Sequence, residues 1–500
     1  MMNRCKIWIL LFGLLTVQAA QAQDAEFIQR ADKLYKNQIY NRAAEMYVTY
    51  LQQNYDYEIN LKLAECYRMM HNTVDAEYWY GVIVDQNAAD PDILKKYADL
   101  LKTNGKYKSA KIYYLKYAAY EEEGYYYAAS CDWAISNKNK APEYYIDTLG
   151  FNTSDSELTP TFFKKGIIYS RSSGNEINPT TGVSYYDLYF TELRNDSLWI
   201  ITPMQNVNTE LHEAAPFYDQ NDKKLYFTRN NHYRGRTVKS KDGEVKLELF
   251  FSTYVDNKFT GSRPVSVNSK TYSVGQPTIS PDGNILIFAS DKPGGYGGID
   301  LYFCSKKGNT WSNAKNMGPA INTAGDELYP FMSIDGTLYF ASNYHPGFGG
   351  FDIFKSSRVD QYWTTPENLG MPVNSSQDDY AMIIKNGFGY FTSNRAGGQG
   401  SDDIYAVTQM SALSKIYVYD TDLKPIYKAR VTFIESPNMQ IICETDAAGL
   451  GDISTLSGAT MGIKISKEGY LDKIVYDLSS LRSSNGIIPV ELQPLLGNNN

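Results

Sequence analysis

The chain has 500 residues, of which 43% are hydrophobic and 21% are charged, and its formal net charge is −8. This length predicts more than one domain, because single hydrophobic cores rarely grow beyond about 250 residues. The negative charge argues against a nucleic acid or an anionic membrane as a partner held by a general electrostatic field. We therefore expect a multidomain globular protein with no nucleic-acid partner.

The first 22 residues have the three-part pattern of a secretory signal peptide. Arg4 and Lys6 come before the apolar run from Ile7 to Val17, and Ala20-Gln21-Ala22 follows that run. The apolar run is too short to cross a bilayer as a helix, which needs about 20 residues. The sequence therefore predicts a signal peptide over residues 1–22, with cleavage after Ala22 and export of the remaining chain.

Small and aromatic residues recur at a spacing of 33 or 34 residues between residues 24 and 137. Small residues let the two helices of a hairpin approach closely, and an aromatic residue fills the gap to the next hairpin. The residues of this pattern are Ala31, Ala64 and Ala98, then Ala43, Ala76 and Ala110, then Tyr47, Tyr80 and Tyr114. The pattern resembles the tetratricopeptide repeat, whose period is 34 residues. We expect three repeats and a closing helix near Tyr125 to Ser136.

The resemblance to tetratricopeptide repeats implies a short α-solenoid with a concave face that carries ligand contacts. By their positions in the first helix of each repeat, the candidate groove contacts are Asp32, Tyr35, Lys36, Glu65, Arg68, Asp99 and Lys102. One interpretation is a groove for a peptide or for the tail of a partner. The other is a solvated face that only orients its neighbours, and the sequence does not distinguish the two.

The stretch FASDKPGGYGGIDLYF, from Phe288 to Phe303, contains a run of glycines that looks like a phosphate-binding loop. It returns as FASNYHPGFGGFDIFK (Phe340 to Lys355) and as FTSNRAGGQGSDDIYA (Phe391 to Ala406). A phosphate loop opens a helix, whereas each of these copies continues into a strand-like pattern. The sequence therefore favours hairpin connections whose glycines need positive φ. These glycines lie at Gly294 to Gly298, Gly347 to Gly350 and Gly397 to Gly400.

An acidic residue opens the third strand of each repeated unit. The five such residues are Asp187, Glu248, Asp300, Asp352 and Asp403. Four short strands in each unit of about 50 residues are typical of a propeller blade. A second motif, NMGPAINTAGDE (Asn316 to Glu327), has a copy before the first unit, TLGFNTSDSE (Thr148 to Glu157). We therefore predict a five-bladed β-propeller over residues 144–409 that is closed by a strand near residues 144–152.

The repeated units resemble the PD40 repeats of TolB-like propellers, in which Ser-Pro-Asp-Gly and a later Gly-Gly-x-Asp-Ile-Tyr recur. After the propeller, KIYVYDTDLKPIYKARVTF (Lys415 to Phe433), TDAAGLGDI and ISKEGYLDKIVYDL follow in order. This order resembles the carboxypeptidase regulatory-like, transthyretin-like β-sandwich, here over residues 412–495. Asp420 and Asp422 are candidates for calcium ligands, although carboxylates are ordinary at a turn. The predicted fold class is thus α followed by all-β, with solenoid, propeller and sandwich in succession.

No enzyme signature is present: the sequence has no HExxH, no GxSxG and no P-loop. Cys66, Cys131, Cys304 and Cys443 lie singly, which favours buried free thiols, although a bridge between Cys66 and Cys131 stays open. A carboxylate pair at the centre of the propeller also stays open, and such pairs perform glycoside hydrolysis. The acidic residues that recur in every blade indicate a structural role. We therefore expect no catalytic residue, no cofactor and no metal.

The order of signal peptide, helical repeats, propeller and sandwich resembles a family of envelope proteins of the Bacteroidota. This family includes the PorE-type component of the type IX secretion system, and many members continue into an OmpA-like peptidoglycan-binding domain. The resemblance implies a non-catalytic periplasmic scaffold associated with the outer membrane. Its partners would be envelope proteins of an outer-membrane complex, such as a PorP/SprF-like barrel or other secretion components.

This sequence departs from the family pattern after Val490 to Pro494, about where the OmpA-like part would begin. Peptidoglycan is therefore an expected partner only if such a domain follows in the native gene. The alternative function is a secreted glycan-binding or carbohydrate-active propeller protein.

Overall fold

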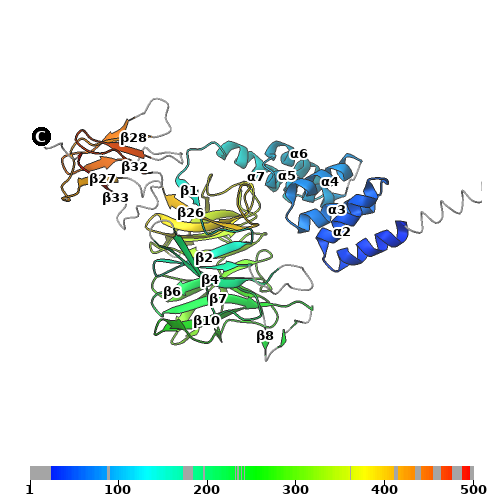
Figure 1. Ribbon diagram of the computed structural model, residues 1–500. Coiled ribbons are helices and arrows are strands. Elements are labelled where there is room, and N and C mark those ends of the chain that lie inside the picture. The colour runs from blue at the N-terminus through cyan, green and yellow to red at the C-terminus, as the bar shows by residue number, and fades with distance from the viewer. Residues whose placement is uncertain are drawn as a thin grey trace, which may run out of the picture. The chain divides into compact units, whose positions relative to one another are not determined.

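The computed structural model shows an N-terminal helical region followed by many β-sheets (Figure 1). It describes residues 24–86, 90–172, 184–194, 198–230, 232–233, 236–237, 239–240, 243–360, 362–409, 415–433, 441–453, 463–475 and 487–495. The expected signal peptide, residues 1–22, lies outside the described residues. None of the helices in these ranges is both long enough and apolar enough to span a lipid bilayer.

The helical region begins with a helix over residues 24–36 and continues with six further helices. These are α2 (Tyr40–Leu51), α3 (Tyr57–Met69), α4 (Thr73–Asp85), α5 (Pro91–Thr103), α6 (Tyr107–Tyr117) and α7 (Glu123–Asn137). Capping side chains set several starts: Asp56 accepts from the amide of Ile59 before α3, and Asp90 accepts from the amide of Asp92 at α5. The fixed φ of Pro91 suits the first turn of α5.

The small and aromatic residues of the sequence pattern form the interior of the helical region. Helices α3 and α4 pack together, as do α5 and α6. All nine residues of the pattern are at most 1% exposed: Ala31, Ala43, Ala64, Ala76, Ala98, Ala110, Tyr47, Tyr80 and Tyr114. The alanines therefore permit close helix packing, and the three tyrosines are among the largest fully buried side chains of the described residues.

Within the described part of residues 144–409, the chain forms five successive antiparallel sheets, which we call the sheet ring. The first two contain β2 (Glu157–Phe163), β3 (Gly166–Arg171), β4 (Asp187–Arg194) and β5 (Leu198–Pro203), then β6 (Glu213–Asp219), β7 (Lys224–Asn230), β10 (Leu247–Val255), β11 (Lys258–Phe259) and β12 (Arg263–Pro264). The third contains β13 (Val274–Ile279), β14 (Ile285–Ser290), β15 (Asp300–Lys307), β16 (Thr310–Trp311) and β17 (Lys315–Asn316).

The last two sheets of the ring have four strands each, as the first sheet does. They contain β18 (Glu327–Met332), β19 (Leu338–Ser342), β20 (Asp352–Ser356) and β23 (Glu367–Asn368), then β24 (Asp379–Lys385), β25 (Phe388–Ser393), β26 (Asp403–Gln409) and β1 (Tyr144–Thr148). Two short ribbons lie outside these sheets: β8 (His232–Tyr233) pairs with β9 (Arg236–Thr237), and β21 (Arg358–Val359) pairs with β22 (Tyr362–Trp363).

The first strand of each sheet contacts the first strands of its neighbours. β2, β6, β13, β18 and β24 follow one another in this way, and β24 also contacts β2, so the ring is closed. β1, which precedes β2 in the chain, pairs antiparallel with β26 in the last sheet (Figure 1). The two ends of the ring are therefore held together by main-chain hydrogen bonds within one sheet, which removes a free edge at the junction.

The C-terminal strands form two further sheets around an aliphatic core. One sheet has the order β30 (Leu450–Asp452), β27 (Lys415–Asp420), β33 (Ile487–Leu492), and β27 and β33 run parallel. The other has the order β29 (Ile441–Glu444), β28 (Arg430–Phe433), β31 (Ile463–Ser466), β32 (Lys473–Val475). Alternate residues such as Ile416 and Val418 point into the shared core, as the period of a strand requires.

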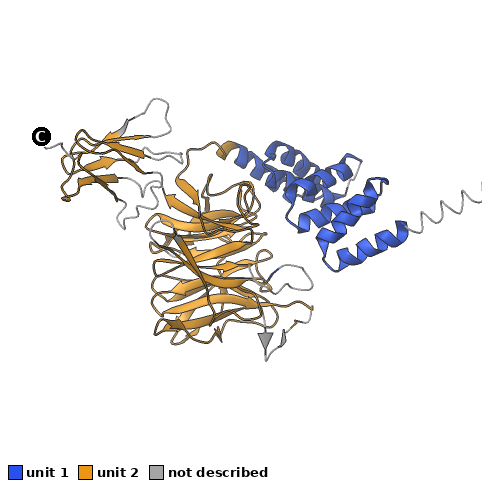
Figure 2. Cartoon of the chain, viewed as in Figure 1, with its two compact units in different colours: residues 1–135, 175–184 blue, residues 136–174, 185–500 orange. Residues whose placement is uncertain are grey.

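The fold class predicted from the sequence is wrong as a division into solenoid, five-bladed propeller and transthyretin-like sandwich. The contacts divide the chain into two compact units, residues 1–135 with 175–184 and residues 136–174 with 185–500 (Figure 2). The sheets are also unequal, since two in the ring have five strands. A physical reason for the single β-rich unit is Phe388 of β25, which packs against the aliphatic core of the C-terminal sheets. The predicted domain boundaries stay predictions.

Candidate functional site

Two of the predicted groove carboxylates bind buried tyrosines of the same unit. Asp32 accepts a hydrogen bond from the Tyr47 hydroxyl at 2.7 Å and another from Lys62 Nζ at 2.9 Å. Asp99 accepts from the Tyr114 hydroxyl at 2.7 Å. In both pairs the tyrosine lies 15 residues after the aspartate, so the same contact recurs in two of the repeats. These carboxylates satisfy hydroxyls that burial would otherwise leave without a partner.

A third predicted carboxylate, Glu65, lies at the centre of an ion cluster. It accepts from Arg68 Nε at 2.7 Å and from Lys96 Nζ at 2.6 Å, which joins α3 to α5. Burial alone would raise the pKa of Glu65, but the hydrogen bonds from Lys96 and Arg68 hold that pKa below its ordinary value. The structure therefore brings Glu65 and Arg68 into direct contact.

The remaining predicted groove residues lie near these clusters with different exposure. Tyr35 packs edge-on against Tyr40 and Tyr47, with ring centroids 5.7 and 6.4 Å apart. Lys36 is exposed and Lys102 is half-buried. The three acidic candidates are thus engaged within their own unit.

The strand-opening carboxylates of the sheet ring bind main-chain amides of their own loops. Asp300 accepts from the amides of Tyr296 at 2.6 Å and Gly297 at 3.0 Å. Asp352 accepts from Phe348 and Gly349, and Asp403 accepts from Gln399 and Gly400, in the same arrangement. Asp187 and Glu248 are half-buried, and burial raises the pKa of both. At Asp300, Asp352 and Asp403 the carboxylate therefore holds the glycine loop in its observed conformation.

Most glycines of these loops are required by close packing, and the prediction that they all need positive φ is wrong. Only Gly294, at φ +88°, and Gly397, at φ +93°, lie in the left-handed region. A Cβ on Gly297 or Gly349 would lie 1.9 Å from a main-chain oxygen of the next sheet's loop. At Gly400 the corresponding distance to the Asp155 oxygen is 1.6 Å. Neighbouring loops thus touch through backbone, where no side chain fits.

Five asparagines join successive sheets of the ring. Asn322 Oδ1 accepts from the Leu301 amide at 2.8 Å, and its Nδ2 donates to the Leu301 carbonyl at 3.0 Å. The asparagines that make such two-way bonds are Asn152, Asn208, Asn268, Asn322 and Asn374. Asn152 binds Ile404, which is 252 residues away, and so ties the first sheet to the last. The two quoted copies of the second sequence motif contain Asn322 and Asn152, although the role of these asparagines was not predicted.

A buried carboxylate follows the asparagine in four of the five copies. These residues, Glu157, Glu213, Glu327 and Asp379, are 0% exposed. Each accepts from the amide and the hydroxyl of a Thr or Ser four residues earlier; for Glu327 the donors are on Thr323, at 2.8 and 2.5 Å. Arg229 pairs with Glu213 at 2.6 Å. The buried structural role of these carboxylates was not predicted from the sequence. The recurring Asn-Thr/Ser-x-x-x-Glu/Asp pattern could have indicated it.

Replacing Glu327 with glutamine should change how the stability of the second unit depends on pH. Burial raises the pKa of Glu327 above its unfolded value of about 4.3, so its stabilising contribution is complete below that value and is lost as pH rises through the folded pKa. Glutamine does not titrate. We expect the stability of Glu327→Gln relative to the native protein to rise between about pH 4 and pH 7, as measured by urea unfolding. A pH-independent difference would contradict this.

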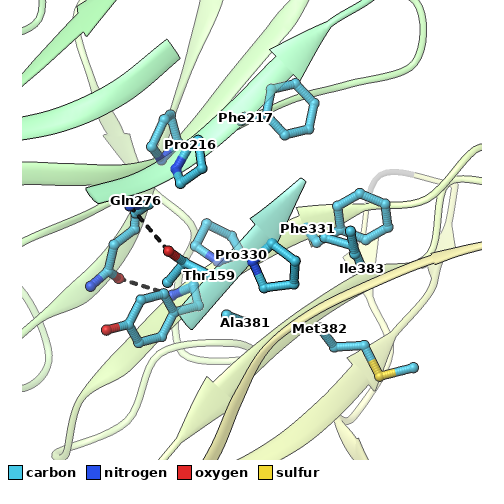
Figure 3. A pocket seen from close by; sticks show the side chains of 13 residues that line it. Thr159, Pro216, Phe217, Gln276, Pro330, Phe331, Ala381, Met382 and Ile383 are labelled. Atoms are coloured by element: carbon cyan, nitrogen blue, oxygen red, sulfur yellow. Dashed lines mark hydrogen bonds between the residues drawn. The ribbon is translucent and has the colours of Figure 1, made fainter. Parts of the chain in front are cut away.

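The centre of the sheet ring contains a small pocket (Figure 3). It is lined by corresponding residues of β2, β6, β13, β18 and β24, at a point where each strand has a register shift. The first residue of each shift has φ between +50° and +55°: Thr159, Ala215, Gln276, Tyr329 and Ala381. Proline follows in four of the five strands. These bulges turn main-chain amides away from their own sheets.

The amides at the bulges bind side chains from other strands of the ring. The Thr159 amide donates to Thr392 Oγ1 at 3.0 Å, and the Gln276 amide donates to Thr228 Oγ1 at 2.8 Å. The Tyr329 amide donates to Gln276 Oε1 at 2.9 Å (Figure 3). The strained residues are therefore held by hydrogen bonds that cross from one sheet to the next.

The central pocket has a volume of about 30 Å³, which is room for one or two water molecules. The carboxylate pair that the sequence left open for this place is not among the residues that line it, which are uncharged. The lining combines the uncharged polar residues Thr159, Gln276 and Tyr329 with prolines and with apolar side chains such as Phe217, Phe331 and Met382 (Figure 3). This arrangement suits packing between sheets.

Among the described residues, no group of three or more His, Cys, Asp or Glu side chains is placed to hold a metal ion. Asp420, a calcium candidate, instead accepts from the amides of Asp422 and Lys424 at 2.9 Å each, as in an ordinary turn. Cys66 and Cys131 are buried free thiols, so they form no bridge.

No protein family matches the chain, and no curated protein matches it. Solved structures similar to it include a puromycin hydrolase mutant complexed with PGG, at 9% identity over 57% of this chain and 57% of that chain (TM-score 0.32). TolB from Acinetobacter baumannii is similar at 14% identity over 51% and 54% (TM-score 0.29). A thermostable family-43 glycoside hydrolase is similar at 13% identity over 53% and 91% (TM-score 0.35).

The structural neighbours thus include TolB-like β-propeller proteins as well as hydrolases. The chain spans 57%, 56% and 54% of the length of the first three structures that it matches.

Proposed function

We propose that this protein is a non-catalytic interaction protein of the bacterial cell envelope, which works with an outer-membrane complex such as the type IX secretion apparatus or a related assembly. The proposal rests on the structural role of the carboxylates that recur in the sheet ring. Asp300, Asp352 and Asp403 each bind two amides of their own loop, so these groups hold the fold. Helical repeats such as those expected over residues 24–137 present extended concave surfaces that bind other proteins.

The envelope location rests on the signal-peptide pattern and on the order of sequence patterns that resembles the Bacteroidota envelope family. The expected partners are envelope proteins, such as a PorP/SprF-like barrel or other secretion components. The partner contacts are proposed to include Lys36 and Lys102, because the predicted acidic contacts Asp32, Glu65 and Asp99 are engaged within the helical region.

Affinity capture with the full mature chain from envelope extracts tests this function. The native protein should enrich outer-membrane proteins, and Lys36→Glu with Lys102→Glu should reduce that enrichment about tenfold by removing favourable charge contacts. The matched control, Lys108→Glu with Lys138→Glu, changes two exposed lysines outside the predicted groove by the same total charge. Recovery of no envelope protein above a blank resin would contradict the function, and equal loss in both variants would contradict the groove.

A further inference from the structure

A second cavity of about 400 Å³ lies between the second and third sheets of the ring, away from the central pocket. Residues of β7, β10 and β15 line it, together with residues around β12 and β16. Strands β7 and β10 are neighbours in the second sheet (Figure 1). The volume falls in the range of roughly 300–1,000 Å³ that is typical of small-molecule sites, whereas the central pocket is far smaller.

Three aromatic side chains line this cavity. Tyr226 and Phe251 come from paired strands of the second sheet, and their ring centroids are 5.9 Å apart. Trp311 comes from the third sheet, where it packs against the core and keeps part of its surface exposed. Aromatic rings at a polar cavity offer flat surfaces on which the C–H face of a sugar ring can pack.

Charged side chains from both sheets meet in the same cavity. Asp222 Oδ2 accepts from Lys224 Nζ at 3.1 Å and from Lys306 Nζ at 2.9 Å. Hydrogen bonding from Lys306 lowers the pKa of Asp222, so the carboxylate is ionised near neutral pH. Two ammonium groups face Asp222, and a second carboxylate, that of the buried Asp219, also interacts with Asp222 and Lys306. Each ammonium has three N–H donors. The two lysines therefore have N–H donors beyond those bound to Asp222.

The charge and the aromatic rings together restrict the ligand. A purely apolar ligand would have to desolvate two lysines and an aspartate, which is costly. A small inorganic anion would use the lysines but would leave the aromatic surfaces and most of the volume without contacts. A ligand with a ring, several hydroxyls and one negative group can contact the aromatic surface, pair with the lysines and fill the volume.

We propose that this cavity binds an acidic saccharide, a sugar unit that carries a carboxylate. The sugar ring packs against Trp311, and its carboxylate accepts hydrogen bonds from Lys306 and from Lys224, whose ammonium lies over the Phe251 ring, 5.3 Å from its centroid. Asp222 holds the two ammonium groups in place and accepts from sugar hydroxyls. This site goes beyond the proposed interaction function and does not depend on the helical region.

Isothermal titration of the full mature chain with trigalacturonic acid tests the site, with neutral maltotriose and acetate as comparison ligands. We expect trigalacturonic acid to bind and both comparison ligands to bind at least about tenfold more weakly. Lys306→Gln and Trp311→Ala should each weaken binding of trigalacturonic acid at least about tenfold.

Two matched controls separate the site from general effects of the substitutions. Lys307→Gln alters the next residue of β15, which is exposed and does not line the cavity. Trp363→Ala removes the tryptophan of the β21–β22 ribbon, which also lies outside the cavity. Both controls should bind as the native chain does.

The proposal is overturned if the native chain does not bind trigalacturonic acid, or if maltotriose or acetate binds equally well. It is also overturned if Lys307→Gln and Trp363→Ala lose binding as much as Lys306→Gln and Trp311→Ala. Thermal unfolding of each variant shows whether it folds. If Lys306→Gln does not fold, Lys224→Gln, which removes the other ammonium, replaces it and should weaken binding of trigalacturonic acid to the same extent.

Discussion

Gly400→Ala is expected to destabilise the second unit by about 3 kcal/mol, because the added methyl group has no space. A Cβ at this position would lie 1.6 Å from the Asp155 oxygen and 2.8 Å from the Thr153 oxygen. Both oxygens belong to backbone, which cannot move aside as a flexible side chain can. The substitution would force apart the last and first sheets next to the hydrogen bond from the Glu157 amide to the Asp402 carbonyl.

Gly397→Ala is the matched control, because it tests backbone conformation without a clash. Gly397 has φ +93°, and a Cβ there would have nothing within 4 Å. Alanine at such a φ costs about 1 to 2 kcal/mol. Urea unfolding of both variants should therefore give the larger loss for Gly400→Ala. A larger loss for Gly397→Ala would mean that positive φ, and not close approach, is the main reason for glycine in this loop.

The sequence was most informative where one local pattern recurs. The helical period identified the buried residues of the hairpins, such as Ala64 and Tyr80, because spacing along a helix determines which side chains share a face. The recurring acidic residue marked the start of β15, β20 and β26, because the same loop is built each time. In such cases, neighbouring residues in the chain contain most of the relevant interactions.

The features that sequence reasoning missed depend on residues far apart in the chain. Phe388 belongs to a repeated strand pattern, yet it packs against the C-terminal core and so contributes to a single β-rich unit. Asp222 and Lys306 are 84 residues apart and meet only because the second and third sheets are neighbours. Trp311 and Trp363 follow corresponding strands of two repeated units in the sequence, but nothing local indicates that Trp311 lines a cavity. Periodicity shows which side chains share one face of a helix or strand, but it does not show which distant residues pack against that face.

Arg395→Met is expected to destabilise the second unit by about 3 to 5 kcal/mol, because it leaves a buried charge without its partner. Arg395 Nη2 donates to Asp379 Oδ1 at 2.5 Å, and Asp379 is 0% exposed. The guanidinium also donates to the carbonyls of Pro372 and Val373, at 2.8 and 2.6 Å. Methionine keeps much of the side-chain volume but none of these donors.

The pH dependence and a double variant distinguish loss of the ion pair from loss of packing. Burial raises the pKa of Asp379, so its stabilising contribution is complete below the unfolded value and declines as pH rises through the folded pKa. Removing Arg395 takes away the charge that opposes this shift, so the deficit of Arg395→Met should be larger near neutral pH than in acid. Adding Asp379→Asn should recover part of the loss, since no unpaired carboxylate then remains. If urea unfolding shows no recovery in the double variant, the cost comes from the lost carbonyl contacts and packing of Arg395 rather than from the buried charge.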